Sequence, residues 1–357
     1  MTGESLIRAG IVGANPERGW ARDAHVPALR HLSTDYTLAA VSARTQEIAD
    51  AAKLASGAER AYGDSLALAR DPGIDLVIVA VKVPEHRAVV LAALAAGKHV
   101  YCEWPLGRDV AQAEEMAAAV TPGIHATIGL QARSAPAVRQ AAAIVQSGAL
   151  GKLRSLRVLS PTAGWGAESP AFYAYLQDKR NGATLETIAG GHTLAAIEAV
   201  VGRYVAVDAR ATILRPDMRI SGTEETVART CADHMAVLGR HDSGCVSVLE
   251  VVGGTTTMPF RFELEGEHGW LRLTGGHPGG FQAGALTIES DVEIPPAPAV
   301  AADLSGPPRN VAESYVRFAA DIRADTFTVP DFADAVRLSR LLDHIETASD
   351  TGMRQTV

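Results

Sequence analysis

The sequence contains few cysteines and no paired cysteine motif. Its 357 residues include three cysteines, Cys102, Cys231 and Cys245. An odd number of thiols without a C-x-x-C pair argues against a disulfide scaffold and against a zinc ribbon. Thiols used in this way fit a reducing compartment, so a cytoplasmic location is expected.

Long apolar runs are also missing. The longest strongly apolar stretches, such as 76–81, are far shorter than the roughly 20 residues that cross a bilayer. The N-terminal stretch 1–10 lacks the basic and apolar regions of a signal peptide. We therefore expect neither a membrane span nor a secreted protein.

The chain has no excess of basic residues, because 33 Lys and Arg stand against 41 Asp and Glu, for a net charge of −8. Nucleic acid and acidic membranes need a basic footprint, so neither is expected as the main partner. The histidines lack metal-ligand spacing, and no metal site is expected. The absence of a G-x-S-x-G motif and of a Walker-type loop argues against hydrolases and NTPases.

What is present is an ordinary globular composition, with 47% hydrophobic and 21% charged residues. At roughly 150 residues per domain, the length predicts two domains with full cores.

The first part of the chain alternates short apolar runs with amphipathic helical patterns. Strands are expected at 7–13, 36–42, 75–81, 99–102 and 125–130, and helices at 45–54, 84–96, 110–119 and 135–147. Asp109 is placed to cap the third of these helices, and Gly97 and Gly148 to end the second and fourth. Such alternation is typical of an α/β doubly wound parallel sheet, so residues 1–130 are expected to form a Rossmann domain, linked onward by the helix at 135–148.

The second part is richer in strands. They are expected at 154–159, 205–214, 227–238, 245–252, 260–265 and 270–273, with helices at 191–201, 311–324 and 332–349 and a loop at 295–308. This pattern predicts an α+β domain over 149–357 with a large open, mostly antiparallel sheet. The last helix is expected to pack back on the first domain.

A glycine turn follows the first strand. Gly13, Asn15 and Gly19 give an imperfect G-x-G-x-x-G pattern in which Asn15 replaces the second glycine. A turn of this kind between a strand and a helix exposes backbone N–H groups to a dinucleotide pyrophosphate. A glycine turn without a ligand is the alternative.

The end of the second strand carries no carboxylate that would hold the ribose hydroxyls of NAD. Ser42, Arg44 and Thr45 stand there instead and suit a 2′-phosphate, which favours NADP over NAD. The alternative, that Arg44 is a solvated residue at the start of a helix, is equally open.

Several pieces of sequence occur in a recognisable order. They are 25–29, 75–80, 84–86, 95–100, 103–106 and 147–151. On these pieces the chain resembles the glucose–fructose oxidoreductase/inositol dehydrogenase (Gfo/Idh/MocA) family, over nearly all of the first domain and more thinly in the second. Within the family it is most similar to the galactose-regulon-repressor-like branch, through Gly13, Asn15, 19–21, 103–104, 164–165 and 191–193.

The resemblance implies an NAD(P)-dependent oxidoreductase acting on a sugar, a polyol or a related small carbonyl compound. It implies a homo-oligomer, a dimer or tetramer, formed through the C-terminal sheet. The residues expected to bind the cofactor are Gly13, Asn15, Arg18, Gly19, Trp20, Ser42, Arg44, Thr45, Val81, Lys82, His86, Glu103, Trp104 and Gln131. By the same resemblance, Glu103 would accept a hydrogen bond from the nicotinamide ribose.

The chain departs from the family at two catalytic positions. The family's Glu-Lys-Pro is here Glu103-Trp104-Pro105, and the family's Asp four residues before the histidine is here Ile188. His192 is kept and is the expected base, because imidazole titrates near neutral pH. A buried structural histidine is the alternative.

Further residues are expected to contact the substrate. They are Trp104, Trp165, Tyr173, Tyr175, Lys179 and His192, for which interface packing or an exposed loop is nearly as plausible. Lys82 follows the apolar strand at 75–81 and is expected to supply the missing lysine's charge, with a solvated surface lysine as the alternative. The loss of both family residues favours a rival function, a cofactor-binding regulator without turnover.

Overall fold

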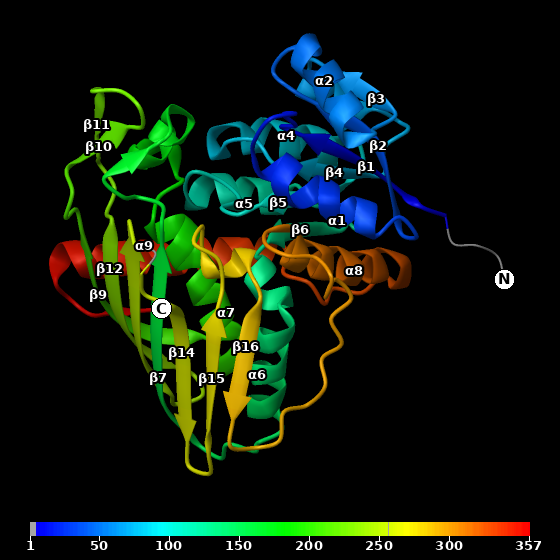
Figure 1. Ribbon diagram of the computed structural model, residues 1–357. Helices are drawn as coiled ribbons and strands as arrows, with labels where there is room; N and C mark the ends of the chain where they lie inside the picture. The colour runs from blue at the N-terminus through cyan, green and yellow to red at the C-terminus, as the bar shows by residue number, and fades with distance from the viewer. Residues whose placement is uncertain (1–4, 256) are drawn as a thin grey trace. The chain divides into compact units, whose positions relative to one another are not determined.

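The computed structural model describes residues 5–255 and 257–357, so the first four residues of the N-terminal stretch considered above lie outside it. The chain forms two compact units (Figure 1). One comprises residues 1–130 and 300–336, and the other residues 131–299 and 337–357.

The chain thus returns to its first unit near the C-terminus, where we had expected a second domain running unbroken from 149 to 357. The returning segment, 300–336, carries helix α8 (Pro308–Ala324). The last helix, α9 (Phe332–Thr351), begins in that segment, but from Arg337 on it belongs to the second unit. The helix that lies wholly within the returning segment is α8.

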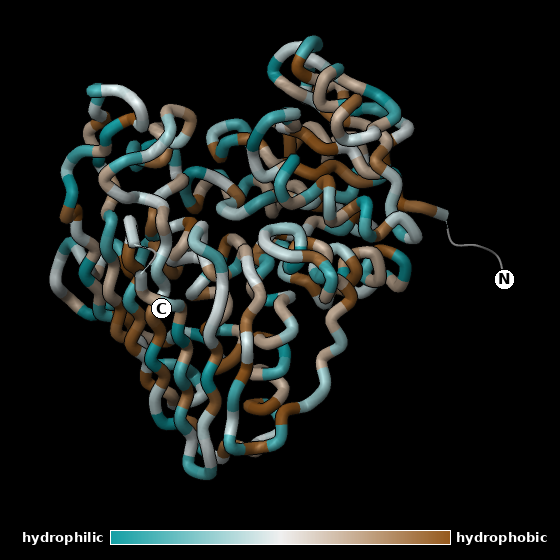
Figure 2. The backbone as a smooth tube through the Cα atoms, in the orientation of Figure 1, coloured by the Kyte–Doolittle hydropathy of each residue, from teal (hydrophilic) through white to brown (hydrophobic). Residues whose placement is uncertain are grey.

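The first unit holds a six-stranded parallel sheet in the order β3-β2-β1-β4-β5-β6, which confirms the predicted Rossmann fold. Its strands are β1 (Ile7–Val12), β2 (Tyr36–Ser42), β3 (Arg60–Tyr62), β4 (Leu76–Val79), β5 (His99–Glu103) and β6 (Ala126–Gly129). Strand β4 is buried over its whole length, as a central parallel strand covered on both faces must be. Figure 2 shows this apolar colouring along the central strands.

Helices cover both faces of this sheet. They are η1 (Ala21–His25), α1 (Val26–His31), α2 (Gln46–Ser56), α3 (Ser65–Arg70), α4 (Val83–Ala95), α5 (Val110–Ala118) and the returning α8. Asp109 caps α5 as expected, since its carboxylate accepts the N–H of Gln112 at 2.9 Å. The sequence patterns did not indicate β3, α3 or η1, because each is too short for its period to show.

The second unit is built on an eight-stranded sheet in the order β16-β15-β14-β7-β13-β12-β9-β17. Its strands are β7 (Leu153–Thr162), β9 (Tyr204–Thr212), β12 (His234–His241), β13 (Val246–Gly253), β14 (Phe260–Gly266), β15 (Trp270–Gly275), β16 (Leu286–Ser290) and β17 (Gln355–Thr356). The β7–β13 pair is parallel and the other pairs are antiparallel, which confirms the predicted mostly antiparallel sheet.

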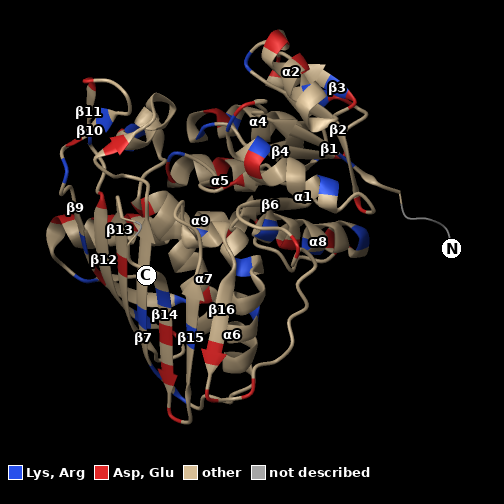
Figure 3. Cartoon of the chain, viewed as in Figure 1, with Lys and Arg blue, Asp and Glu red and all other residues tan. Residues whose placement is uncertain are grey.

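One face of this sheet is packed and the other is exposed. Residues alternate between buried and exposed along β13, the pattern of a strand with one face in the core. Helices α6 (Pro136–Gln146) and α7 (Gly191–Val201) belong to the packed side, and α6 packs against β15 and β16. Both signs of charge lie along β7 and β14 (Figure 3).

The stretch 227–238 was predicted as one strand, and this was wrong. It divides into β11 (Thr226–Ala228) and β12, and β11 joins β10 (Asp217–Ile220) and β8 (Glu168–Ser169) in a separate small sheet. The break is stabilised by a buried ion pair, because Arg229 Nη1 donates to Asp233 Oδ2 at 2.9 Å. Short helical turns η2 (Gln131–Ser134), η3 (Ala171–Gln177), η4 (Lys179–Asn181), η5 (Glu186–Gly190) and η6 (Phe281–Ala283) complete the unit. Among the described helices, none combines the length and apolar character that crossing a bilayer requires.

Candidate functional site

The turn after β1 lies at the carboxyl edge of the parallel sheet. Gly13 has φ +98°, a left-handed conformation that favours glycine. The N–H groups of Gly13 and Ala14 both donate to the carbonyl oxygen of Ser42, at 3.1 and 2.8 Å, which fixes the turn to the end of β2. On its other side Gly13 approaches the backbone after β4 too closely for any side chain. The backbone of the turn is therefore fixed between the ends of β2 and β4.

Asn15 organises the rest of the turn. Its side-chain oxygen accepts the N–H groups of Glu17 at 2.9 Å and Arg18 at 3.2 Å, which closes an Asx turn. Gly19 has φ +97°, and no atom lies within 4 Å of where a Cβ would stand. Trp20 is the N-cap residue of η1, a single π-helical turn of a kind often found at functional sites.

The end of β2 separates three residues that the sequence grouped together. Ser42 is buried, and its hydroxyl donates to Ser65 Oγ at 3.3 Å. Thr45 caps α2, because its hydroxyl accepts the N–H of Ile48 at 3.3 Å. Arg44 is exposed and makes no hydrogen bond or ion pair with any residue that the structure describes. Of the three, Arg44 is therefore the side chain best placed to meet a ligand.

The segment after β4 carries Val81 and Lys82. Lys82 is exposed and occupies the N-cap position of α4, next to the turn at Gly13 because β4 pairs with β1. The strand order thus places Lys82 at the carboxyl edge of the parallel sheet, where the sequence predicts it.

His86, which we expected among the cofactor ligands, is buried on α4. Its Nε2 lies 3.0 Å from the carbonyl oxygen of Val81 and its Nδ1 lies 3.0 Å from that of Pro105. Burial lowers the pKa of His86, although these carbonyl contacts act in the opposite direction. The imidazole thus ties the segment after β4 to the segment after β5 and faces backbone oxygens.

Glu103 ends β5, at the same edge. Its carboxylate lies 3.1 Å from Nε2 of His25, which is fully buried in η1. The other ring nitrogen of His25, Nδ1, lies 2.6 Å from the hydroxyl of Tyr315 on α8. Trp104 follows Glu103 and is 5% exposed, so it is a packed side chain more than an open platform.

His25 and Tyr315 are site residues that sequence reasoning missed. A signal for His25 existed, since it begins one of the pieces that carry the family resemblance, at 25–29. Tyr315 gave none, because it reaches this edge on a helix that follows Glu103 by about two hundred residues and returns through tertiary structure.

In the second unit, His192 lies in the first turn of α7 and is 4% exposed. The start of α7 is fixed to β7, because the hydroxyl of Thr193 donates to Ser160 Oγ at 2.8 Å. Gly190 lets the helix approach β12, since a Cβ there would stand 2.7 Å from the Met235 side chain. The backbone that carries His192 is therefore fixed against β7 and β12.

Trp165 has φ +57°, a strained conformation for a residue with a side chain. Its indole N–H donates to the carbonyl oxygen of Leu176 at 3.1 Å, which joins the loop after β7 to η3. Arg229 fixes the same loop by donating to the carbonyl oxygen of Gly166 at 2.7 Å. Strain supported on several sides in this way is common at ligand sites.

The remaining predicted substrate residues lie on η3 and η4. Tyr173 is exposed, whereas burial raises the pKa of Tyr175 to about 12. Lys179 forms an ion pair with Glu346, and Gln131, expected at the cofactor, is buried in η2. The structure thus collects Gly13, Arg44, Lys82 and Glu103 at one edge of the first unit, and places the substrate candidates other than Trp104 in the second.

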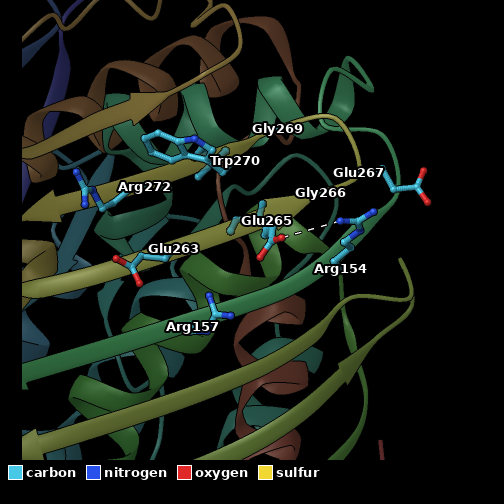
Figure 4. Close-up of a pocket in the computed structure, with 11 residues that line it drawn as sticks. Arg154, Arg157, Glu263, Glu265, Gly266, Glu267, Gly269, Trp270 and Arg272 are labelled. Atoms are coloured by element: carbon cyan, nitrogen blue, oxygen red, sulfur yellow. Dashed lines mark ion pairs between the residues drawn. The ribbon is translucent and has the colours of Figure 1, made fainter.

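A shallow pocket of about 530 Å³ lies on the exposed face of the large sheet (Figure 4). Basic and acidic side chains from β7 and β14 alternate along it, and Arg154 Nη1 lies 4.0 Å from Glu265 Oε1. Arg272 lies over the ring of Trp270, 5.9 Å from its centroid. The pocket lacks the enclosed apolar lining of a small-molecule site.

Comparison with known proteins agrees with this geometry. Residues 7–122 match the Gfo/Idh/MocA model, an oxidoreductase family with an NAD-binding Rossmann fold, and residues 136–275 match the C-terminal domain of Gal80p. The galactose/lactose metabolism regulatory protein GAL80 of Kluyveromyces lactis is 30% identical over 292 residues, which are 75% of this chain and 64% of that protein.

Among solved structures, levoglucosan dehydrogenase in complex with NADH and levoglucosan has the same fold, with a TM-score of 0.83 at 21% identity over 99% of each chain. The dehydrogenase aclE of Aspergillus oryzae is 33% identical over 282 residues, which are 75% of this chain and 77% of that protein. At this identity and coverage, the chain belongs to the Gfo/Idh/MocA oxidoreductase family and carries its NAD-binding Rossmann domain.

Proposed function

We propose that this protein is an NAD(P)-dependent oxidoreductase that acts on a sugar, a polyol or a related small carbonyl compound. The observation that carries the proposal is the carboxyl edge of the parallel sheet, where the tight turn at Gly13 lies beside the segment carrying Lys82. Glu103 ends the next strand at the same edge. The levoglucosan dehydrogenase of the same fold, solved with NADH and a sugar, supports this class of reaction.

Three parts of the proposed site have separate roles in the reaction. The turn at 13–19 and Glu103 would hold the cofactor, which would supply or accept the hydride when bound. His192 takes the hydroxyl proton on oxidation and returns it on reduction, a task that an imidazole can perform. Lys82 supplies positive charge that stabilises a developing alkoxide, the role of the lysine that Trp104 replaces.

We propose that NADP is preferred to NAD. Arg44 is exposed at the start of α2 and has no partner among the described residues, so it can form charge-assisted hydrogen bonds with a 2′-phosphate. No carboxylate stands at the end of β2 to receive a 2′-hydroxyl.

A second function is favoured by two substitutions. Trp104 and Ile188 replace the family's lysine and aspartate, and the second unit matches a Gal80p domain. A cofactor-binding regulator without turnover would show these features. A panel of sugars, polyols and their oxidation products, followed at the absorbance of NADH and NADPH, separates the two. Turnover of any compound supports the enzyme, whereas tight cofactor binding without turnover supports the regulator.

We further propose a homo-oligomer built through the exposed face of the large sheet. Leu238 and Val248 are paired across β12 and β13 and are 54% and 50% exposed. Asp208 is paired with Leu238 and Arg157 with Val248, so charges of both signs flank them and the face can pair with a second copy of itself. Val248→Glu should convert the oligomer to a monomer in light scattering, and an unchanged mass would contradict this interface.

The cytoplasmic location remains part of the proposal. Its structural support is that Cys102, Cys231 and Cys245 are all free and buried. Free thiols persist in a reducing compartment.

A further inference from the structure

A buried line of three side chains connects α8 to the carboxyl end of β5. The hydroxyl of Tyr315 lies 2.6 Å from His25 Nδ1, and His25 Nε2 lies 3.1 Å from Glu103 Oε1. Tyr315 and His25 are fully buried, while the side chain of Glu103 is 14% exposed. The line therefore runs from the interior of the first unit to the one member that solvent reaches.

Burial sets the protonation state of Tyr315 in this line. Burial raises the pKa of Tyr315 well above its usual range, and Tyr101, Glu103 and Tyr36 act in the same direction. Tyr315 therefore stays a hydroxyl, which is able to donate to His25 Nδ1. A neutral imidazole that accepts at Nδ1 carries its proton on Nε2, which faces the carboxylate.

The tyrosine is itself well fixed. The hydroxyl of Tyr36 donates to the backbone carbonyl oxygen of Tyr315 at 2.7 Å, and the ring of Tyr101 packs against that of Tyr315 with centroids 4.9 Å apart. At the other end, His25 Nε2 and Glu103 are within ion-pair distance but off the direction of an ideal hydrogen bond. Such bonds at functional sites commonly align only when the ligand is bound.

We propose that Tyr315 and His25 are positioning residues that hold the Glu103 carboxylate in the orientation in which it accepts a ribose hydroxyl of the cofactor. An ionised carboxylate accepts several hydrogen bonds, so His25 and a ligand hydroxyl can share it. A side chain that its neighbours already hold in place loses no rotamer freedom when the ligand binds. The inference rests on the proposed function, because it assumes that the protein binds NAD(P).

The test compares two tyrosine variants of the same buried cluster. Tyr315→Phe removes the hydroxyl that contacts His25, and Tyr36→Phe removes a hydroxyl that contacts only backbone. Tyr315→Phe should raise the Kd of the cofactor about threefold to tenfold, the usual effect of one hydrogen bond. Tyr36→Phe should lower the melting temperature and raise the Kd less than Tyr315→Phe does, because its hydroxyl contacts the backbone of Tyr315 and not His25.

The line is then tested for coupling. In a Glu103→Ala background, Tyr315→Phe should no longer change the Kd, because the two residues act through one another. An effect of Tyr315→Phe that persists in that background, or no effect in the wild-type background, would overturn the inference. A wild-type protein that binds neither cofactor contradicts the proposed function, which is a separate result.

A measurement on the unaltered protein keeps the inference testable even if the variants do not fold. Nitrogen-15 chemical shifts of His25 report which ring nitrogen carries the proton. We expect a proton on Nε2, the nitrogen that faces Glu103. A proton on Nδ1 alone would contradict it, since Nε2 then has no proton to direct at Glu103.

Discussion

A Cβ placed on Gly13 would stand 2.7 Å from the backbone carbonyl oxygen of Ala80, closer than real Cβ atoms approach any atom. Gly19, in the same turn, has nearly the same φ but open space around it. The two glycines therefore separate the cost of a left-handed backbone from the cost of a steric clash.

Gly13→Ala should be the more damaging of the two alanine variants. The left-handed backbone lowers its free energy of unfolding by about 1–2 kcal/mol, and the new methyl group must also displace the segment after β4. In Gly19→Ala only the left-handed backbone lowers the free energy of unfolding, because the added methyl group meets open space. Chemical denaturation and cofactor titration of both variants give the comparison, and equal losses of stability and affinity would show that the approach to Ala80 is unimportant.

Arg44→Ala should weaken NADPH binding by about tenfold to a hundredfold, the scale of a charged hydrogen bond, and leave NADH binding unchanged. Arg70→Ala serves as the matched control, because it removes an exposed arginine in the last turn of α3 and not at the end of β2. Calorimetric titration with both cofactors measures the effect. Clearly tighter binding of NADH than NADPH by the wild-type protein would reject the proposed preference.

Lys82→Met should lower kcat by roughly 10²-fold, the usual effect of removing one group that stabilises developing negative charge. Lys53→Met, on α2, removes a lysine of the same unit away from the end of β4 and should leave kcat unchanged. Steady-state kinetics with the best substrate of the panel decide the matter. Near wild-type kcat and KM in Lys82→Met would identify Lys82 as a surface charge.

The pH dependence of stability should carry the signature of buried histidine. Burial lowers the pKa of His86, so the folded protein takes up its proton less readily than the unfolded chain, whose histidines titrate at about pH 6.5. This contribution to stability is present above that pH and is lost as the pH falls toward the folded value. Burial also lowers the pKa of His99 and His241, which add to the same trend.

His86→Gln should therefore show a smaller fall in melting temperature than the wild-type protein between about pH 7.5 and pH 5.5, even though its stability at neutral pH is lower. His268→Gln, at an exposed position, is the control and should follow the wild-type protein. If His86→Gln and the wild-type protein lose stability in parallel, His86 does not contribute to the acid response.

Local patterns predicted the elements that are long and periodic. The apolar runs of the parallel strands identified the sheet, and α7 spans the predicted residues 191–201. The short β3 and α3 gave no periodic signal, and the break between β11 and β12 depends on Arg229 and Asp233 meeting in the folded state. The two residues are only four positions apart, but the burial of their ion pair is decided by the folded structure and not by this spacing.

The candidate site was predictable to the same extent. Gly13, Lys82 and Glu103 follow strands, so strand order alone places them at one edge. The burial of His86 and the capping role of Thr45 depend on side-chain geometry, and each changed what those residues are able to do. Tyr315 was missed because the path of the chain back to its first unit leaves no local pattern.

The most direct test of the central claim is the comparison of wild-type protein and His192→Ala in one experiment, with cofactor affinity and turnover measured on the same preparations. The account predicts that the wild-type protein oxidises or reduces at least one sugar, polyol or small carbonyl compound. In His192→Ala, kcat should fall by about 10²-fold or more while the Kd for the cofactor stays the same. A wild-type protein that binds cofactor tightly but turns over nothing across the panel, or a His192→Ala variant with unchanged kcat, would contradict it.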